Sequence, residues 1–505
     1  MTGSLTRRQW AAVGVALALA AAALAGGVGL VAHTGAGGPP LATMRPSSPA
    51  SDTHSGSGTH SGSGTHSGGG THAGSGTVTG RTAGNSGPSE QPVAGWAGHG
   101  AVAFVSDGAL VVIDNGGTEH RVGGTDPVSS PEWSPGAQWV AFLRSAPAPG
   151  FGQGPSRLWV VRPDGTGARA LTPAGADVVD FAWDPAGGNR LAVVTTTTTG
   201  GSPALLLAGV SGPAVPLLSS GLPPVLPGPE SLSWSPDGRT LAVTTAARGA
   251  SGPEVGRIQL VPVAGGPART FVTAAGDTYD LAGWWPDGQG LLYWTDPQGS
   301  ASIAADGLVL SSQATGGPAR PLATTLVHPG WVAWSPDGGT VAVVAGGYRA
   351  VWDGPRRLLT CSVATGACAA VSQPAGSVVT DPAWTAAGLV ADVAPAASSP
   401  SGVPAGLDRS GPPFSPANVG AWYGAHRLAA AGPGGLRPVA GWPLGAHAAM
   451  AVRGGTVCVA GDQLWLLPAG AGSPSRLGAA IGPASVYGAS YYGYIDWRAQ
   501  VAWAA

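Results

Sequence analysis

The chain has 505 residues, a formal net charge of −2 and only 10% charged residues, and all 24 of its basic residues are arginine. Because there is no basic surplus to bind a phosphate backbone, we exclude a nucleic-acid-binding protein. The 85 glycines and 47 prolines argue against a helical protein and favour many short strands joined by tight turns.

The N-terminal segment from Trp10 to Ala32 is uncharged and apolar, and it follows Arg7 and Arg8 directly. This arrangement is typical of a membrane anchor or an export signal whose positive end stays in the cytoplasm. We therefore predict residues 1–9 as cytoplasmic and residues 10–32 as the anchor or signal. The expected location is the cell membrane, crossed once, with the rest of the chain outside the cytoplasm. Cleavage of the segment would give a secreted protein instead.

Residues 33–97 consist mainly of Gly, Ser, Thr, Pro and His. Such a composition buries too little apolar surface to offset the entropy of ordering, so we predict a disordered linker. Within it, His54, His60, His66 and His72 recur at a spacing of six residues. A histidine series can chelate zinc, copper or nickel, whereas Gly/Ser repeats are ordinary flexible linkers. We favour the linker and keep the four histidines as candidate metal ligands.

The remaining residues, 98–505, carry an internal repeat marked by tryptophan. Its six positions are Trp133, Trp183, Trp234, Trp284, Trp334 and Trp384, at intervals of 50 or 51 residues. Most are followed by a Pro-Asp-Gly turn or a close variant, such as Ser235-Pro-Asp-Gly238, and then by an apolar run. Two further apolar runs and a second Gly-containing turn complete each unit. Four strands in about 50 residues are typical of a β-propeller blade, whose ring closure protects the sheet edges.

These units resemble the WD-like Pro-Asp-Gly repeats of the TolB family and the related propellers of prolyl oligopeptidases and actinobacterial envelope proteins. The resemblance covers roughly Gly98 to Leu477 and weakens after Trp384, where the turn reads Thr385-Ala-Ala-Gly388. It implies the propeller fold and leaves the function open.

We predict an all-β protein with a single propeller of eight four-stranded blades, with seven blades as the alternative. Six units begin at the tryptophans, and Thr456 to Leu477 suggests one more. Residues Val102 to Val122 form an incomplete unit that lacks its Trp strand. We expect Tyr494 to Trp497 to supply this innermost strand, so that the two chain ends pair and close the ring.

The sequence contains no recognisable catalytic site. A hydrolase nucleophile motif Gly-x-Ser-x-Gly is missing. Four aspartates, Asp164, Asp237, Asp287 and Asp337, occur so regularly in turns that we interpret them as turn residues. Residues that repeat once per blade pack between sheets, so we assign the tryptophans to the core. We expect no cofactor, and outside residues 33–97 the histidines show no metal-ligand spacing.

Three cysteines in an exported chain suggest one disulfide and one leftover thiol. Cys361 and Cys368 flank a short turn on a predicted hairpin, where a cross-strand disulfide is feasible. We predict this disulfide, with Cys458 as a buried thiol; the alternative is three small core residues.

Variable loops locate the expected binding face. The connection between the second and third strands varies between units, whereas the Pro-Asp-Gly turns hardly change, and insertions confined to one face usually mark the binding side. Among these loops, residues Tyr348 to Arg356 are richest in the residue types of interface hot spots. We predict Tyr348, Arg349, Trp352 and Arg356 as partner-binding residues; aromatic residues that merely cover the blade edge are the alternative.

The predicted function is a non-catalytic, monomeric scaffold of the cell envelope that binds a protein, a peptide or a wall polymer at one propeller face. This prediction rests on fold and location. The alternative is a propeller enzyme of the lyase or glycosidase type with a scattered site.

Overall fold

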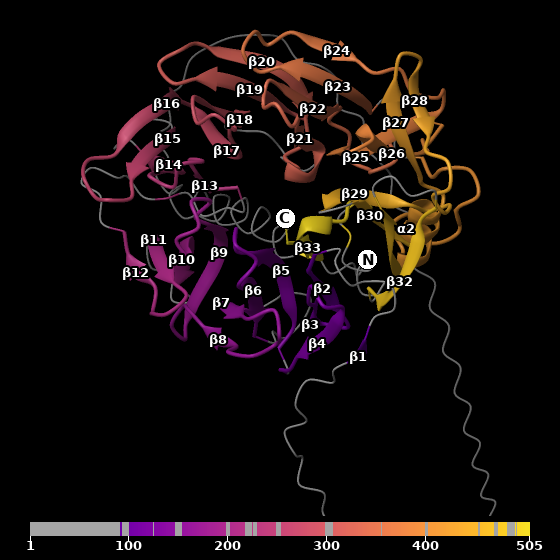
Figure 1. Cartoon of the computed structure of the whole chain (residues 1–505). Helices are drawn as coiled ribbons and strands as arrows, with labels where there is room; N and C mark the ends of the chain where they lie inside the picture. Colours follow the sequence, from indigo (N-terminus) through magenta and orange to yellow (C-terminus); the bar gives the residue numbers. More distant parts are fainter. Residues whose placement is uncertain are drawn as a thin grey trace, which may run out of the picture. The chain divides into compact units, whose positions relative to one another are not determined.

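The computed structural model describes residues 91–92 and 100–504, except for 125, 147–153, 198–202, 218–224, 226–229, 249–253, 298–306, 355, 399–401, 453–454, 469–472, 482–489 and 491. Within these ranges the chain forms eight antiparallel sheets of four strands, one of which has an additional short strand at its edge. The sheets surround a central axis, so this part of the chain is an eight-bladed β-propeller (Figure 1). The prediction of eight blades is confirmed, and the alternative of seven is wrong.

We number the blades along the chain and give their strands from the axis outward. Blade 1 contains β33 (Val501–Trp503), β2 (Val102–Ser106), β3 (Ala109–Ile113), β4 (Thr118–Val122) and the edge strand β1 (Gln91–Pro92). Blade 2 contains β5 (Val128–Trp133), β6 (Val140–Ser145), β7 (Ser156–Val161) and β8 (Arg169–Ala170); blade 3 contains β9 (Ala176–Trp183), β10 (Arg190–Thr197), β11 (Ala204–Gly209) and β12 (Val215–Pro216). Blade 4 contains β13 (Leu232–Trp234), β14 (Thr240–Arg248), β15 (Glu254–Pro262) and β16 (Arg269–Ala275).

The second half of the ring follows the same order. Blade 5 contains β17 (Asp277–Trp284), β18 (Gly290–Pro297), β19 (Leu308–Ala314) and β20 (Ala319–Thr325); blade 6 contains β21 (Val332–Trp334), β22 (Thr340–Ala345), β23 (Arg357–Ser362) and β24 (Cys368–Ala370). Blade 7 contains β25 (Ser377–Thr385), β26 (Gly388–Pro395), β27 (Arg427–Gly432) and β28 (Gly435–Pro438); blade 8 contains β29 (His447–Val452), β30 (Gly455–Ala460), β31 (Gln463–Pro468) and β32 (Ser475–Ala480). The helices are η1 (Pro329–Trp331), α2 (Pro416–Gly424) and η2 (Trp497–Ala499).

The second strand of a blade is apolar on both of its faces because a neighbouring sheet covers each face. In β22, for example, Val341, Ala342, Val343 and Val344 have no exposed surface. Val341 and Val343 pack in a cluster with Leu292 and Leu310 of blade 5. Ala342 packs in another cluster with Val379 of blade 7. The core is therefore a series of apolar layers between adjacent blades, and this explains the nearly continuous apolar runs in the sequence.

The repeated tryptophans join each blade to the one before it. The indole N–H groups of Trp183, Trp234, Trp284 and Trp384 donate to the carbonyls of Glu132, Ala182, Ser233 and Ala333, at 3.0 to 3.2 Å. Each acceptor directly precedes the repeated Trp of the previous blade. The rings also pack in the apolar layers, as Trp183 and Trp234 do. A large apolar ring with one donor satisfies both requirements, which explains why the position recurs once per blade.

The ring is closed by the two ends of the chain, as predicted, but through a different strand. Strand β33 pairs with β2 and places Trp503 opposite Val102. Trp133 then donates its indole N–H to the Ala502 carbonyl at 3.1 Å, which continues the pattern of the other blades. The prediction that Tyr494 to Trp497 form this strand is wrong. Asp496 instead caps the short helix η2 by accepting the backbone N–H groups of Arg498 and Ala499, and the chain reaches the sheet only afterwards.

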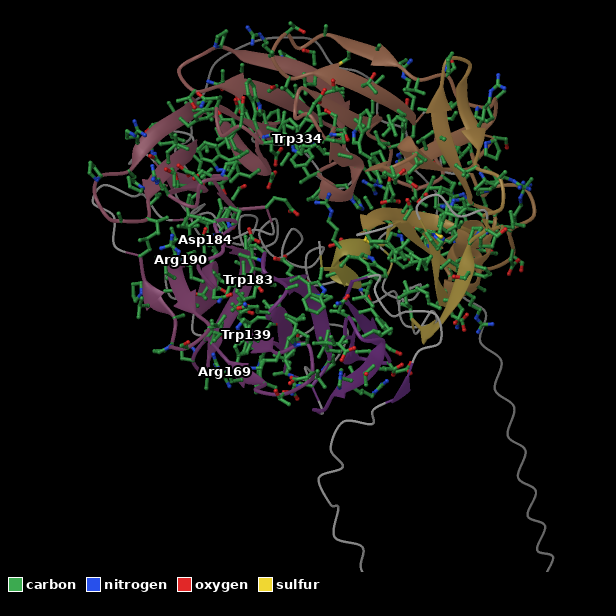
Figure 2. All side chains as sticks on the ribbon, viewed as in Figure 1. Trp139, Arg169, Trp183, Asp184, Arg190 and Trp334 are labelled. Carbon is green, nitrogen blue, oxygen red and sulfur yellow. A yellow bond between two sulfur atoms is a disulfide. The ribbon has the colours of Figure 1, made fainter. Side chains whose placement is uncertain are left out.

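The Pro-Asp-Gly segments form tight turns, as predicted. The Asp237 carboxylate accepts the Ser235 hydroxyl at 2.6 Å and the Arg239 N–H at 3.1 Å, and Gly238 adopts a φ of +67°. The hydrogen bond from Ser235 is the main cause that lowers the pKa of Asp237. In blade 3 the turn reads Trp183-Asp-Pro-Ala-Gly187, so Asp184 takes the position of Ser235; it forms an ion pair with Arg190, N–O distance 2.6 Å (Figure 2). These carboxylates stabilise turns and are therefore not available as acid/base pairs.

Several predictions fall outside the described residues. These are the anchor or signal at residues 10–32 and the candidate ligands His54, His60, His66 and His72. In the described part of the chain no helix is long and apolar enough to cross a membrane. Residues Gln91–Pro92, which lie in the predicted linker, pair with Glu119 and Thr118 at the outer edge of blade 1.

Candidate functional site

One side of blades 6 to 8 carries three insertions, which we call together the insertion surface. They are residues 346–356 between β22 and β23, residues 396–426 between β26 and β27, and residues 490–500, which lead from blade 8 into β33. In Figure 1 the C-terminal segment, in yellow, lies near the middle of the ring. Connections of similar length to the first insertion, residues 146–155 and 298–307, join the second and third strands of blades 2 and 5, whereas that of blade 8 is only Gly461-Asp462. The longest such connection is residues 396–426 of blade 7.

The second insertion contains the helix α2, which the sequence analysis missed. Ser415 caps its N-terminus by accepting the Asn418 N–H at 3.2 Å, and Pro416 takes the first helical position. Both residue types are favoured at these positions. The buried Asn418 side chain accepts the Asp408 N–H and donates to the Asp408 carbonyl, both at 2.8 Å. The helix and the loop before it are therefore one folded unit.

An aromatic core holds the three insertions together. Trp352 has no exposed surface; it stacks on Phe414 at 4.9 Å between ring centroids and meets Trp422 edge-on at 6.0 Å. Its indole N–H donates to the Gly402 carbonyl at 2.9 Å. Trp422 in turn donates to the Pro395 carbonyl at 2.9 Å. Trp352 belongs to the first insertion, and Phe414 and Trp422 belong to the second. Their packing therefore fixes these two loops relative to each other.

Arg356, the last residue of the first insertion, is fully buried and donates hydrogen bonds to the backbone of that insertion. Its guanidinium donates to the carbonyls of Ala350 at 2.7 Å and Asp353 at 3.3 Å, and also to those of Val351 and Tyr348. A further hydrogen bond runs to the Tyr494 hydroxyl, which itself donates to the Tyr348 carbonyl at 2.9 Å.

The same guanidinium is enclosed between two aromatic rings. Its central carbon lies 5.2 Å from the ring centroid of Trp331 and 5.1 Å from that of Tyr494. Burial lowers the pKa of Arg356 and raises that of Tyr494, so the phenol stays protonated at neutral pH. Arginine suits this position because its planar group combines ring stacking with several diverging donors.

The four predicted partner-binding residues therefore separate into two pairs. Trp352 and Arg356 have no exposed surface and are interior residues of the insertions, so neither is accessible to a partner. The sequence did not distinguish them because a loop that folds on itself needs the same aromatic and arginine residues as an interface does. Tyr348 and Arg349 lie at the surface, where the Tyr348 side chain is 39% exposed.

Tyr348 is the one exposed aromatic side chain among the residues that the structure describes. Beside it, the guanidinium of Arg349 lies 5.2 Å from the ring centroid of Tyr492 and donates to the Tyr492 hydroxyl at 3.4 Å. No carboxylate in the described ranges pairs with Arg349. The half-buried Phe414 contacts Tyr492 edge-on at 5.4 Å and extends this aromatic area. The area combines apolar rings with an unneutralised cation.

Acidic side chains occur near the axis of blade 7. Asp381 has a φ of +45° at a bulge in β25, and burial raises its pKa to about 7. Burial also raises the pKa of Asp392, which has no exposed surface and accepts the Ala448 N–H at 2.7 Å. Asp496, which also lies near Asp381, accepts the Arg498 and Ala499 N–H groups as the cap of η2. The two carboxyl groups next to Asp381 are thus bound to backbone.

The described residues contain no group of three or more His, Cys, Asp or Glu side chains arranged to hold a metal ion. Cys361 and Cys368 form a disulfide across the β23–β24 hairpin, where they are directly paired, and Cys458 is a buried thiol. A cavity of about 270 Å³ lies on blade 7 beside Ser377, Ala394 and Leu436, with Arg427 at its lining. It contains none of the predicted partner-binding residues.

These features define the class of protein: an eight-bladed propeller with insertions on one side of three adjacent blades. No protein-family model matches the chain. No curated protein matches it either.

Three solved structures with similar folds are distantly similar to this chain. The β-propeller domain of the Trilobed protease from Pyrococcus furiosus is 12% identical with a TM-score of 0.37, and the match covers 62% of this chain and 92% of that one. Oligogalacturonate lyase from Vibrio parahaemolyticus is 11% identical with a TM-score of 0.41, covering 77% and 97%. A prolyl endopeptidase structure is 12% identical with a TM-score of 0.45 over 71% of this chain, and the chain spans only 51% of its length. The blades themselves establish the fold, and the resemblance to the TolB family gains no support.

Proposed function

We propose that this protein is a non-catalytic scaffold outside the cytoplasm that binds an envelope protein, a peptide or a wall polymer through its insertion surface. Residues 10–32 would hold it at the membrane. The observation that carries the proposal is the aromatic area around Tyr348, where an exposed ring adjoins Arg349, which pairs with no carboxylate in the described part of the chain. Tyrosine and arginine are the residue types that dominate interface hot spots.

An enzyme of the lyase or glycosidase type is the second candidate, and the raised pKa of Asp381 favours it, since a general acid needs a pKa near the working pH. Glycosidases require two carboxyl groups that converge on one substrate. Because Asp392 is fully buried and Asp496 caps a helix, Asp381 has no second carboxyl group free to act with it among the described residues. We therefore rank binding first.

The test is the double substitution Tyr348→Ala and Arg349→Ala in the full chain. Arg356 and Tyr494 bind only the backbone carbonyl of Tyr348, so the fold keeps these contacts and the free energy of unfolding should change by less than about 0.5 kcal/mol. Loss of two hot-spot side chains should weaken partner capture on cells at least tenfold, about 1.4 kcal/mol or more.

The matched control is Val309→Ala, which removes an exposed apolar side chain, 40% exposed, from blade 5. Capture by this variant should equal that of the unmodified protein. Undiminished capture by the Tyr348/Arg349 variant would place the binding site elsewhere.

A further inference from the structure

Two histidines from different blades meet in the interior below the insertion surface. His426 directly precedes β27, and His447 is the first residue of β29. Their ring centroids are 5.6 Å apart, and neither side chain has any exposed surface. The contact joins the end of the second insertion to blade 8.

Aromatic rings surround this pair. Trp422 and Tyr423 of α2 lie 4.3 and 4.7 Å from the ring of His426. Tyr423 and Trp497 lie 4.9 and 4.6 Å from the ring of His447. Two elements, α2 and η2, therefore pack against the pair.

Three of the four ring nitrogens in the pair have no hydrogen-bond partner. The exception is Nδ1 of His447, 2.6 Å from the Gly445 carbonyl, to which it donates. Nδ1 therefore carries the proton, and Nε2 is the site that an added proton would occupy. Water does not reach this site, so a charge there would lack both solvation and a hydrogen-bond acceptor.

The neighbouring titratable groups supply no compensating charge. On β26 and β25, Asp392 and Asp381 have pKa values raised by burial, so both carboxyl groups become neutral in acid. The buried thiol of Cys458 on β30 also has a raised pKa, and Tyr423 of α2 carries a phenol. On η2, Asp496 is bound to backbone N–H groups, and Arg498 is itself a cation.

A continuous path of ring contacts connects the pair with the surface. His426 contacts Trp422, Trp422 contacts Trp352, and Trp352 stacks on Phe414. Phe414 contacts Tyr492, over which Arg349 lies. Displacement of α2 would therefore disturb the aromatic area that contains Tyr348 and Arg349.

We propose that the His426–His447 pair is an acid-sensitive latch: protonation below about pH 5 displaces residues 402–426 of the second insertion and thereby releases a partner from the insertion surface. The inference rests on the proposed function for the partner, whereas the opening itself is a property of the protein alone.

The direction follows from the pKa values. Burial lowers the pKa of His447 to about 4 and lowers that of His426 as well, against 6.5 for an exposed histidine. The open state therefore binds more protons, and the closed state loses stability as the pH falls below 6.5. For His447 alone, the open-to-closed ratio should rise roughly 30-fold between pH 7.5 and pH 5. Asp381 and Asp392 would act in the opposite direction if they became exposed, because burial raises their pKa values, but they lie on β25 and β26, outside the displaced residues 402–426.

Amide hydrogen exchange of the full chain at pH 7.5 and pH 5, corrected for the intrinsic exchange rate, tests the latch without any partner. Residues 402–426 should open more readily at pH 5, by up to about 30-fold. Residues 240–262, in β14 and β15 of blade 4, should show no such change. Equal opening of residues 402–426 at both pH values would overturn the proposal.

Substitutions assign the effect to the pair. His447→Asn keeps a side-chain donor for the Gly445 carbonyl and removes the titrating ring, so the dependence on pH should fall substantially; adding His426→Phe should abolish it. If the double variant does not fold, His447→Asn alone tests the assignment.

The matched control is His120→Gln in blade 1, where the buried histidine already pairs with Asp114 at 3.1 Å. The assignment would be contradicted if the opening of residues 402–426 still depended on pH in the His447 variant, or no longer depended on pH in the His120 variant. Because no partner is present, these results are independent of the Tyr348/Arg349 capture experiment.

Discussion

Replacing Arg356 by methionine should lower the free energy of unfolding by about 3–5 kcal/mol, the range measured when one member of a buried charged network is removed. Methionine retains much of the volume but none of the donors. The carbonyls of Tyr348, Ala350, Val351 and Asp353 would remain buried without their shared donor, and the Tyr494 hydroxyl would lose its donor too. Urea denaturation monitored by tryptophan fluorescence measures the change.

The neighbouring residue provides the control. Arg357 is exposed at the start of β23, so Arg357→Met should alter the free energy of unfolding by no more than about 0.5 kcal/mol. Similar losses for both variants would mean that Arg356 acts only through its charge and not through its buried contacts.

Removing residues 500–505 should have the largest effect, a loss of at least about 4 kcal/mol in the free energy of unfolding. The truncation deletes β33, so β2 becomes an unpaired edge and Trp133 loses the Ala502 carbonyl. It also removes Val501 and Ala504, which are 2% and 5% exposed and pack in two apolar clusters. The open edge should in addition promote association between chains, measurable by light scattering.

If the truncated chain is too unstable to purify, two further experiments test whether the ring depends on the pairing of β33 with β2. A synthetic peptide with the sequence of residues 497–505, added during refolding, should restore a cooperative unfolding transition by pairing with β2. Among the described elements, a chain that begins at Gly98 loses β1, a two-residue edge strand, and should keep its stability within about 1 kcal/mol. An unchanged transition after deletion of residues 500–505 would show that the ring does not depend on the pairing of its ends.

The periodic part of the sequence predicted the fold well because one physical requirement acts in most of the blades. An indole must fill the layer between two sheets and donate to the preceding blade, so Trp recurs at nearly constant spacing. The closing strand was misplaced because β33 has only three residues, too short an apolar run to be recognised on its own. The same three residues occur at Val332-Ala-Trp334 in blade 6, a signal that would have identified the strand.

The candidate site was harder to predict because insertions do not follow the repeat. Ser415-Pro416 was a recognisable helix start, but it lies in a segment outside the repeat and the helix was missed. Whether an aromatic residue of one insertion is exposed depends on the other insertions. Trp352 is buried by Phe414 and Trp422, whereas the Tyr348 side chain is 39% exposed. The contact between His426 and His447 depends on the packing of blade 7 against blade 8, which no local pattern encodes.

Photo-crosslinking on intact cells tests the central claim, that the insertion surface is the binding side. A photoreactive amino acid is placed at Tyr348 on that surface or at Arg239 in the Pro-Asp-Gly turn of blade 4, and adducts are identified after irradiation. The account predicts a specific partner adduct from position 348 and none from position 239. A specific adduct from position 239 together with none from position 348 would contradict it.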